Sequence, residues 1–492
     1  MEKAIKIKQN DNCAVALQNL QKGENYFSVT LTENIDKGHK FALSDINVGD
    51  KVIKYGEKIG CATQNIHSGS HIHTHNLSTN ISERAQYEYV KTVAPRKLLR
   101  KEKQVNVYER ANGDIGVRNE LWVVTTVGCV NSQAKSIVEE FKRRNNSLDG
   151  IDGVFAITHP YGCSQVGQDY LRTRKFLQEI VLHPNAGGVL VLGLGCENNQ
   201  MSDFIATLGN FDESRIKFLI AQEVDDEIDS GARLLQQIYE VARQDRRSPH
   251  NISCLKVGLK CGGSDGLSGI TANPLVGLFC DYLTEAGGTA VLTEVPEMFG
   301  AERLLMSRAK DISVFNKTVK LINDFKDYYI SNNQQVYDNP SPGNKQGGIT
   351  TLEDKSLGCT QKSGFGQIDD VVFDGETLTN SGLNLLNGVG NDMVAVTNLG
   401  ASGCQMVIFT TGRGTPFGGF VPTLKVSTNN DLYNRKRNWI DFNAGEIIDG
   451  EKFSALVEKL IDLVVDVANG KQTANEKNNS REIAIFKTGV TL

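Results

Sequence analysis

Three of the eight histidines stand at alternate positions, His71, His73 and His75. On a β-strand, alternate side chains share one face and lie about 7 Å apart. Imidazole binds Zn, Fe, Ni and Cu, and with added carboxylate or water ligands it also suits Mn. We therefore predict a divalent metal site with His71 and His73 as ligands and His75 beside them. The alternative is an exposed polar strand edge.

Seven of the ten cysteines adjoin a glycine, namely Cys61, Cys129, Cys163, Cys196, Cys261, Cys359 and Cys404. Cys129, Cys163 and Cys196 each follow an apolar run that is typical of a strand, and open parallel sheets bind ligands beyond the carboxyl ends of their strands. The three thiols are candidates for metal ligands or for an iron–sulfur anchor, or they are small hydrophobes beside tight turns. Cluster-binding chains often space cysteines closely, whereas the nearest pair here, Cys254 and Cys261, is seven apart. This spacing favours a mononuclear ion over an iron–sulfur cluster.

Glycine-rich loops at 260–269, 363–366 and 410–419 combine a bendable backbone with hydroxyls or a cation. Such loops suit a small polyhydroxylated acid, because amides and Lys or Arg bind its carboxylate and polar side chains bind its hydroxyls. The alternative is ordinary turn chemistry. We expect Lys260 or Arg413 to pair with the carboxylate. The residues predicted to bind substrate are Gly262, Gly263, Ser264, Asp265, Thr411 and Arg413.

The segment 193–198 is similar to a dinucleotide-binding fingerprint, but Asn198 occupies the place of its third glycine. Without that glycine the close helix–sheet packing of the motif is lost, so nucleotide binding is disfavoured. The amide groups of the turn can still bind a carboxylate.

The elements that must position these residues alternate between strand and helix. Residues 11–76 have short strand-like runs broken by glycine, which indicates a small β module. Beyond it, unbroken apolar strands alternate with helices, and this pattern predicts parallel sheets covered on both faces. The polar stretch 333–368 is long for a bare connector and is a candidate site loop. The expected strands are 121–127, 153–158, 188–194, 216–221, 289–294, 393–397, 406–411 and 482–486, and the expected helices are 132–144, 166–182, 199–208, 227–246, 274–286, 319–329 and 453–468.

The predicted fold class is therefore α/β, with a small N-terminal β-clip-like module followed by a large two-part α/β region with mostly parallel sheets. The expected divisions are a β module over 1–80, a linker over 81–110, and α/β domains over 111–270 and 271–492. A chain of 492 residues is long enough for about three domains of ordinary size.

The composition excludes several classes of protein. The chain carries 53 basic and 58 acidic residues, a net charge of −5, which is unsuited to broad nucleic-acid binding. It has no apolar run of the roughly 20 residues that span a bilayer, and its N-terminus lacks the apolar region of a secretion signal. Ten cysteines without a Cys-x-x-Cys pair do not form a secreted disulfide framework. We expect a cytoplasmic protein with free thiols, and the sequence is compatible with a homo-oligomer.

Several motifs together resemble those of the altronate/galactarate dehydratase family. They are Tyr108–Asn119, Gly162-Cys163, Gly195-Cys196-Glu197 and Gly262–Pro274, of which the Gly-Gly-Ser-Asp-Gly run is the most specific. The module that ends in 71–76 resembles the amino-terminal SAF (β-clip) domain of that family. The resemblance extends from about residue 10 to the carboxyl end, and in length and domain order the chain is more similar to the altronate than to the galactarate enzymes. A sulfolactate-splitting lyase uses similar domains.

The resemblance implies an iron(II)- or manganese-dependent hydro-lyase that converts D-altronate to 2-dehydro-3-deoxy-D-gluconate and water in hexuronate breakdown. A divalent ion would stabilise the enediolate, while a base takes the C2 proton and an acid protonates the departing hydroxyl. The predicted catalytic residues are Lys260, His159 and Glu197. The alternatives are galactarate dehydration, carbon–sulfur cleavage, and, less favoured, nicotinamide-dependent oxidation or non-catalytic sugar-acid binding.

Overall fold

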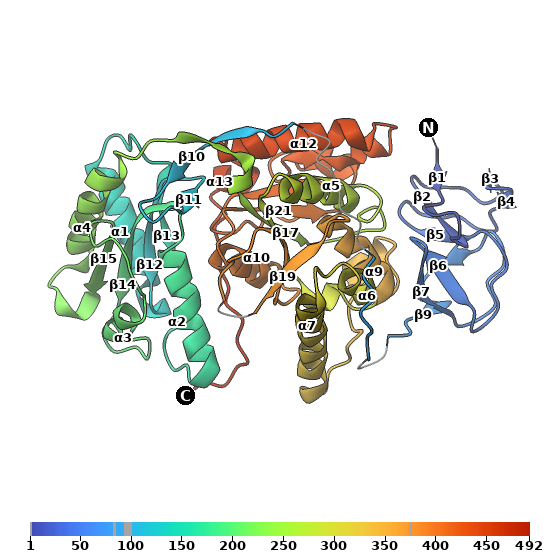
Figure 1. The fold of residues 1–492 in the computed structure, drawn as a ribbon, viewed down its shortest axis with the longest axis horizontal. Helices are drawn as coiled ribbons and strands as arrows, with labels where there is room; N and C mark the ends of the chain where they lie inside the picture. The colour runs from blue at the N-terminus through green and yellow to red at the C-terminus, as the bar shows by residue number, and fades with distance from the viewer. Residues whose placement is uncertain (1, 82–84, 93–100, 374–375) are drawn as a thin grey trace.

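A computed structural model describes residues 2–81, 85–92, 101–373 and 376–492. The chain forms an N-terminal β region and two α/β regions, each built on a parallel sheet. In Figure 1 the β region lies on the right, the larger α/β region in the middle and the smaller one on the left. The predicted fold class is confirmed.

The N-terminal β region consists of small antiparallel sheets. The strand predicted to carry all three histidines is shorter than expected, because only His71 and Ile72 pair with a neighbour and residues 73–76 turn away. Asn76 stabilises this turn, since its side chain accepts a hydrogen bond from His73 N and donates one to the His71 carbonyl oxygen. The strands are β1 (Ala4–Ile5), β2 (Cys13–Ala16), β3 (Asn25–Tyr26), β4 (Val29–Thr30), β5 (Lys40–Ala42), β6 (Lys51–Lys54), β7 (Glu57–Ala62), β8 (His71–Ile72) and β9 (Leu77–Ser78).

The connecting segment is shorter than the linker expected over 81–110, parts of which lie outside the described residues. Strand β10 (Gln104–Glu109) already belongs to a sheet, in which it pairs with β11 (Ile115–Gly116) and β16 (Ser248–Asn251).

The smaller α/β region has four parallel strands in the order β13-β12-β14-β15. Alternate residues of its central strand enter different cores, with Leu121 and Val123 packing under α1 and α4 and Trp122 and Val124 packing under α2. The strand–helix alternation predicted for this stretch is confirmed. Its elements are β12 (Glu120–Thr125), α1 (Asn131–Arg144), β13 (Gly153–Ile157), α2 (Gly167–Val181), β14 (Ala186–Gly193), α3 (Met201–Ala206), β15 (Ile216–Ile220) and α4 (Glu227–Ala242).

The larger α/β region has seven parallel strands in the order β19-β20-β18-β17-β21-β22-β23. Its first strand begins at Lys256, ahead of the division expected near residue 270. Strands are β17 (Lys256–Cys261), β18 (Thr289–Leu292), β19 (Ile368–Val372), β20 (Gly382–Leu386), β21 (Met406–Thr411), β22 (Thr423–Ser427) and β23 (Phe442–Asn443). Helices are α5 (Ala272–Glu285), α6 (Glu302–Met306), α7 (Ile312–Ser331), α8 (Pro342–Gln346), α9 (Leu352–Cys359), α10 (Asp392–Ala401), α11 (Asn430–Arg435), α12 (Phe453–Ala468) and α13 (Ala474–Lys477).

Three sequence predictions in this region are wrong. Residues 393–397 belong to helix α10, which packs between the larger sheet and α2, and a short apolar run has no period that separates helix from strand. Residues 482–486 form no strand, although Ile483 and Ile485 are buried. The stretch 333–368 contains α8 and α9 rather than an extended loop.

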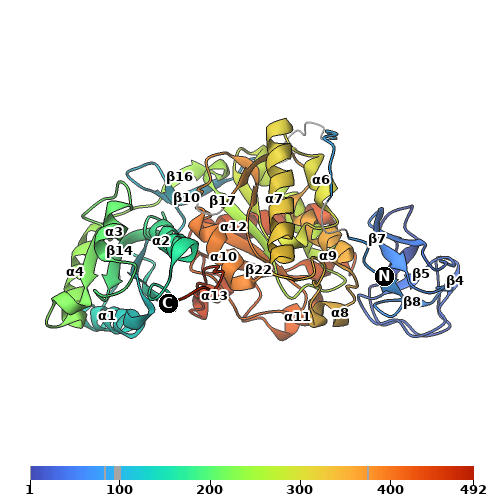
Figure 2. The ribbon, with the colours of Figure 1, turned by 90° about the horizontal axis from the view of Figure 1, so that it is seen from below.

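The N-terminal β region docks on α8 and α9, which lie on the side of the larger region that faces it in Figure 2. Asp354 of α9 is the centre of this contact, because it accepts hydrogen bonds from Lys40 Nζ at 2.9 Å and from Lys54 Nζ at 3.0 Å. All three side chains are about 1 % exposed or less. Among the described helices, none combines the length and apolarity needed to cross a membrane.

Candidate active site

A cavity of about 720 Å³ lies where β17 and β18 end. Crevices at the carboxyl ends of parallel strands are the usual ligand sites of open α/β sheets. Gly262 and Gly263 form one wall. A Cβ atom at position 262 would lie 2.5 Å from the Phe409 ring and 2.6 Å from the Asp392 carboxylate, so a side chain there would displace these neighbours. The other polar residues that line the cavity are Glu297, Tyr329, Gln335, Asp338, Asn339, Ser341, Asn344, Lys345, Lys355 and Asp392.

A buried network of charges supports this cavity. Lys260 Nζ contacts the Glu294 carboxylate and lies 2.7 Å from Asp392 Oδ1. Lys355 Nζ lies 2.8 Å from Glu297 Oε1, and Lys362 Nζ donates to Cys261 Sγ at 2.7 Å. The positive charges of the lysines and the negative charges of the carboxylates in this network therefore compensate one another.

Mutual pairing keeps most of these groups charged despite their burial. Burial lowers the pKa of Lys260, but Glu294 and Asp392 outweigh it and raise that pKa above its ordinary value. Burial raises the pKa of Glu297, but Lys355 and Lys260 outweigh it and hold that pKa below the ordinary range. The pKa of Glu294 is raised, by burial first and then by the Glu297 charge. The cavity wall thus offers both a carboxylate and an ammonium group.

Two thiols adjoin the network. Cys261 Sγ lies 3.1 Å from Glu297 Oε2 and 3.4 Å from Cys359 Sγ. Within the described residues, these three side chains are the one group of metal-ligating atoms that all lie within 4.8 Å of one another. The hydrogen bond from Cys261 and burial raise the pKa of the Cys359 thiol well above its ordinary value.

The three predicted histidines gather with a fourth, His39. His39 Nδ1 lies 2.9 Å from His71 Nε2, and the ring centroids of His39, His71 and His73 are 5.1–5.3 Å apart. His75 is exposed, with its ring 5.7 Å from that of His71. His39 was missed because it is 32 residues away, and only the antiparallel pairing of β5 with β8 brings it close.

The imidazoles of His71 and His73 are neutral at physiological pH. Burial lowers the pKa of His71 to about 3, with further contributions from His39 and His73. Burial likewise lowers the pKa of His73 to about 4, against the effect of its hydrogen bond to Lys345. A neutral imidazole keeps a lone pair for a metal ion.

Helix α8 joins the histidine cluster to the cavity. Its residues Asn344 and Lys345 line the cavity, while the Lys345 carbonyl oxygen accepts from His73 Nε2 at 2.9 Å. The Gln346 carbonyl oxygen lies 3.2 Å from His39 Nε2. Helix α8 belongs to the stretch 333–368 that the sequence indicated as a site segment.

The predicted substrate-binding residues fall into two groups. Gly262 and Gly263 line the cavity. The other four residues make hydrogen bonds around the cavity. The Ser264 carbonyl oxygen accepts from Asn344, and the buried Asp265 carboxylate accepts from Ser268, Thr428 and Asn429. Thr411 Oγ1 accepts from Gly414 N, and the exposed Arg413 donates to Gln346 Oε1 at 3.0 Å.

The predicted catalytic residues are not together. Lys260 belongs to the charged network but is fully buried and does not line the cavity. His159 and Glu197 lie at the smaller sheet, where His159 Nε2 donates to the Thr125 carbonyl oxygen and Glu197 accepts from Thr126 Oγ1. Lys260 lies in β17 of the larger sheet, whereas His159 and Glu197 lie on loops that follow β13 and β14 of the smaller sheet. A linear pattern does not reveal this separation.

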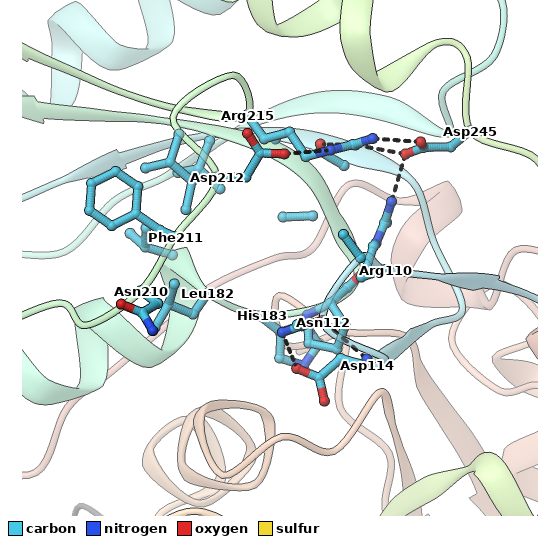
Figure 3. A pocket seen from close by; sticks show the side chains of 18 of the residues that line it. Arg110, Asn112, Asp114, Leu182, His183, Asn210, Phe211, Asp212, Arg215 and Asp245 are labelled. Carbon is cyan, nitrogen blue, oxygen red and sulfur yellow. Dashed lines mark hydrogen bonds and ion pairs between the residues drawn. The ribbon is translucent and has the colours of Figure 1, made fainter.

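A second cavity, of about 500 Å³, opens between the β10–β11 hairpin and the edge of the smaller sheet (Figure 3). Its main charges are already paired, because Arg110 Nη1 and Arg215 Nη2 both lie 2.7 Å from the Asp245 carboxylate. Its histidine, His183, is buried and engages the Cys404 carbonyl oxygen.

The N-terminal β region and the two parallel sheets divide the chain into three parts, and each part matches the model of a known protein family. Residues 2–80 match the altronate/galactarate dehydratase SAF domain, and residues 107–243 match the D-galactarate dehydratase/altronate hydrolase second domain. Residues 252–491 match the D-galactarate/altronate dehydratase C-terminal domain. The chain belongs to the altronate/galactarate dehydratase family.

Within this family, the chain is 55% identical to the altronate dehydratase of Escherichia coli K12, over 99% of both chains. It is 51% identical to the altronate dehydratase of Bacillus subtilis 168, over the full length of both. The galactarate dehydratase (L-threo-forming) of Escherichia coli K12 is 33% identical, over 98% of this chain and 96% of that one. The chain is a hydro-lyase, and it is more similar to these altronate enzymes than to the galactarate enzyme.

Proposed function

We propose that the chain dehydrates D-altronate to 2-dehydro-3-deoxy-D-gluconate and water. The observation that carries this proposal is the polar cavity at the carboxyl ends of β17 and β18, whose wall places Lys345 and Lys355 beside amide and hydroxyl side chains. A sugar acid needs a cation for its carboxylate and polar partners for its hydroxyls. The similarity to two altronate dehydratases supports altronate as the substrate.

The family implies a metal ion, iron(II) or manganese, and the histidine cluster fits one. Two ligand nitrogens at right angles on an ion, each about 2.1 Å from it, lie about 3 Å apart, which matches the 2.9 Å between His39 Nδ1 and His71 Nε2. We propose that His71 and His39 bind the ion, with His73 and His75 beside them, because His39, His71 and His73 do not offer three ligand atoms that all lie within 4.8 Å of one another. The bound ion would act as a Lewis acid that stabilises negative charge on the substrate.

The group of Cys261, Glu297 and Cys359 fits a cation less well. Lys362 already donates to Cys261, and Lys355 is paired with Glu297. A divalent ion there would have to displace at least one buried ammonium group, whereas the imidazoles are neutral. We therefore assign proton transfer rather than metal binding to this group.

In this assignment, Glu297 takes the C2 proton and Lys355 protonates the departing C3 hydroxyl group. Both line the cavity, and they lie 2.8 Å apart. Asn339 and Asn344 hold Lys355 in place by accepting from its Nζ at 3.0 and 3.1 Å. Loss of the C2 proton and of hydroxide, which leaves as water, yields an enol that becomes the 2-keto acid.

The test is a substrate panel. Chelated protein, reloaded with iron(II) or manganese, is incubated with D-altronate, D-galactarate and sulfolactate, and the 2-keto product is measured. We expect 2-dehydro-3-deoxy-D-gluconate from altronate, with the highest kcat/KM of the three. Faster turnover of galactarate or release of sulfite would overturn the choice of substrate. A change in NAD(H) absorbance during turnover, or binding of altronate without product, would overturn the reaction class.

A further inference from the structure

Three cysteines are exposed at one edge of the smaller sheet. Cys129 follows β12, Cys163 follows β13 and Cys196 follows β14, and the other seven free thiols are buried or half-buried. The three strands are adjacent and parallel, in the order β13-β12-β14, so their carboxyl ends meet at the same edge. Free cysteine is normally a small buried hydrophobe, so three exposed thiols at one edge are unusual.

The loops that carry these thiols contact one another directly. Gly128 N donates to the Tyr161 carbonyl oxygen at 2.8 Å, which joins the first loop to the second. Ser164 N donates to Asn198 Oδ1 at 2.7 Å, which joins the second loop to the third. Asn199 Nδ2 donates to the Thr126 carbonyl oxygen at 3.3 Å, which joins the third to the first. Each of the three loops is therefore hydrogen-bonded to the other two.

The residues beneath the loops hold this arrangement. A Cβ atom on Gly162 would lie 2.1 Å from the Thr126 carbonyl oxygen, so the glycine before Cys163 is needed for the close approach. Glu197 accepts from Thr126 Oγ1 at 2.7 Å and from Leu194 N at 3.0 Å. His159 and Glu197 are thus positioning residues of this edge.

The arrangement is unsuited to a single ion. Three thiolates bound to one ion, each at about 2.3 Å, would hold their sulfurs within roughly 4 Å of one another. Among the described residues, the group of ligand atoms within 4.8 Å of one another is Cys261, Glu297 and Cys359, so the sulfurs of Cys129, Cys163 and Cys196 are more widely spaced. In an iron–sulfur cluster each thiolate binds its own iron, which suits wider spacing.

We propose that Cys129, Cys163 and Cys196 bind a four-iron iron–sulfur cluster at the exposed edge of the smaller sheet. Each thiol releases its proton as it binds one iron, and the fourth iron is left for a ligand from outside these three cysteines. The cluster is assembled from two ferrous ions, two ferric ions and four sulfide ions, so assembly needs no oxidant or reductant. The site is on a different sheet from the cavity, so the inference does not rest on the proposed function.

The test is anaerobic reconstitution of the full chain with equal amounts of ferrous and ferric iron and with sulfide. We expect a brown protein with about four sulfides per chain and about four irons beyond any iron at the histidine cluster. Cys129→Ser, Cys163→Ser and Cys196→Ser should each lower both contents to below about a quarter of the parent value. Cys61→Ser, which changes a half-buried thiol in β7, is the matched control and should keep the full content. Thermal unfolding of each variant without iron shows whether it is folded.

Two results would overturn the inference. One is a folded chain carrying His71→Ala and His73→Ala that takes up iron but no sulfide under the same conditions. The other is a folded serine variant with the cluster content of the parent. The variant His71→Ala with His73→Ala should keep its cluster, so failure of the histidine site and failure of this inference are distinguishable.

Discussion

The loops at the carboxyl ends of the two parallel sheets resemble each other in sequence and differ in environment. Cys261 is the last residue of β17 and Cys196 follows β14, and both cysteines adjoin a glycine. Cys261 is buried among ammonium and carboxylate groups, and Cys196 is exposed. One edge thus offers paired charges for proton transfer, and the other offers free thiols.

The difference follows from what covers each edge. The N-terminal β region packs on α8 and α9 beside the larger sheet and excludes water from that part of the molecule. Ionised groups taken out of water must be paired, because an unpaired buried charge costs several kcal/mol. The same sequence pattern therefore has different chemistry at the two sheets.

The largest expected effect concerns the histidine cluster, which would hold a metal ion beside the cavity of the larger sheet. Replacing His71 and His73 by Ala should lower the rate of metal-dependent dehydration about a thousand-fold. A Lewis acid stabilises the transition state by several kcal/mol, and each 1.4 kcal/mol corresponds to a tenfold change in rate. The measurement is kcat/KM with altronate together with metal content. His67→Ala, a change of an exposed histidine outside the cluster, is the control. Full activity with unchanged metal content in the double variant would contradict the assignment.

The next effect is on stability and concerns the contact between the N-terminal β region and helix α9 beside the larger sheet. Asp354→Asn should lower the free energy of unfolding by about 3–5 kcal/mol, because Lys40 and Lys54 would lose their buried partner. Urea unfolding measures it. Asp431→Asn removes the exposed ion pair with Lys37 between the same two regions and should cost at most about 1 kcal/mol. Equal losses in the two variants would contradict the role of burial.

The same residue makes stability depend on pH. Burial raises the pKa of Asp354, but Lys40 and Lys54 outweigh it and hold the pKa below the ordinary 3.8. A depressed carboxyl pKa stabilises the fold above the unfolded value, and this contribution is lost as pH falls through the folded pKa. The parent should therefore lose stability below about pH 4 more steeply than Asp354→Asn. Parallel curves of unfolding free energy against pH would count against this pairing.

A smaller effect is expected at the cavity wall. Lys345→Ala should lower kcat/KM for altronate by about 10–100-fold, because a charge-assisted hydrogen bond to a carboxylate contributes about 1.5–3 kcal/mol. The change leaves the Lys345 carbonyl oxygen, and hence the contact with His73, in place. Lys345→Arg should recover most of the activity. An unchanged kcat/KM in the alanine variant would place the carboxylate elsewhere.

The smallest effect is expected at Arg413. It is exposed and donates to the Gln346 side chain on α8 rather than lining the cavity. Arg413→Ala should lower kcat/KM by about tenfold, because it loosens one contact of α8 and removes one nearby positive charge. A loss as large as that of Lys345→Ala would show that Arg413 itself binds the substrate.

Much of this arrangement was predictable from local patterns. The apolar strands before Cys129 and Cys196, and the polar stretch that contains α8, were recognisable because burial on both faces and turn chemistry leave periodic signals. Helix α10 was mistaken for a strand because a fully buried helix has no polar face. Lys355, Glu297 and His39 were missed, since each has its role only through partners that are distant along the chain.

By itself the sequence determined the class of fold, the family and the types of group available, because periodicity, glycine turns and motif residues are local properties. Only the tertiary structure decided which groups meet. The pairing of β5 with β8 adds His39 to His71, and the order β13-β12-β14 gathers three thiols. Packing of the N-terminal β region on α9 buries Asp354 with two lysines. The physical reason is that pKa values and metal affinity depend on burial and on neighbouring charges, which are set by contacts between residues far apart in sequence.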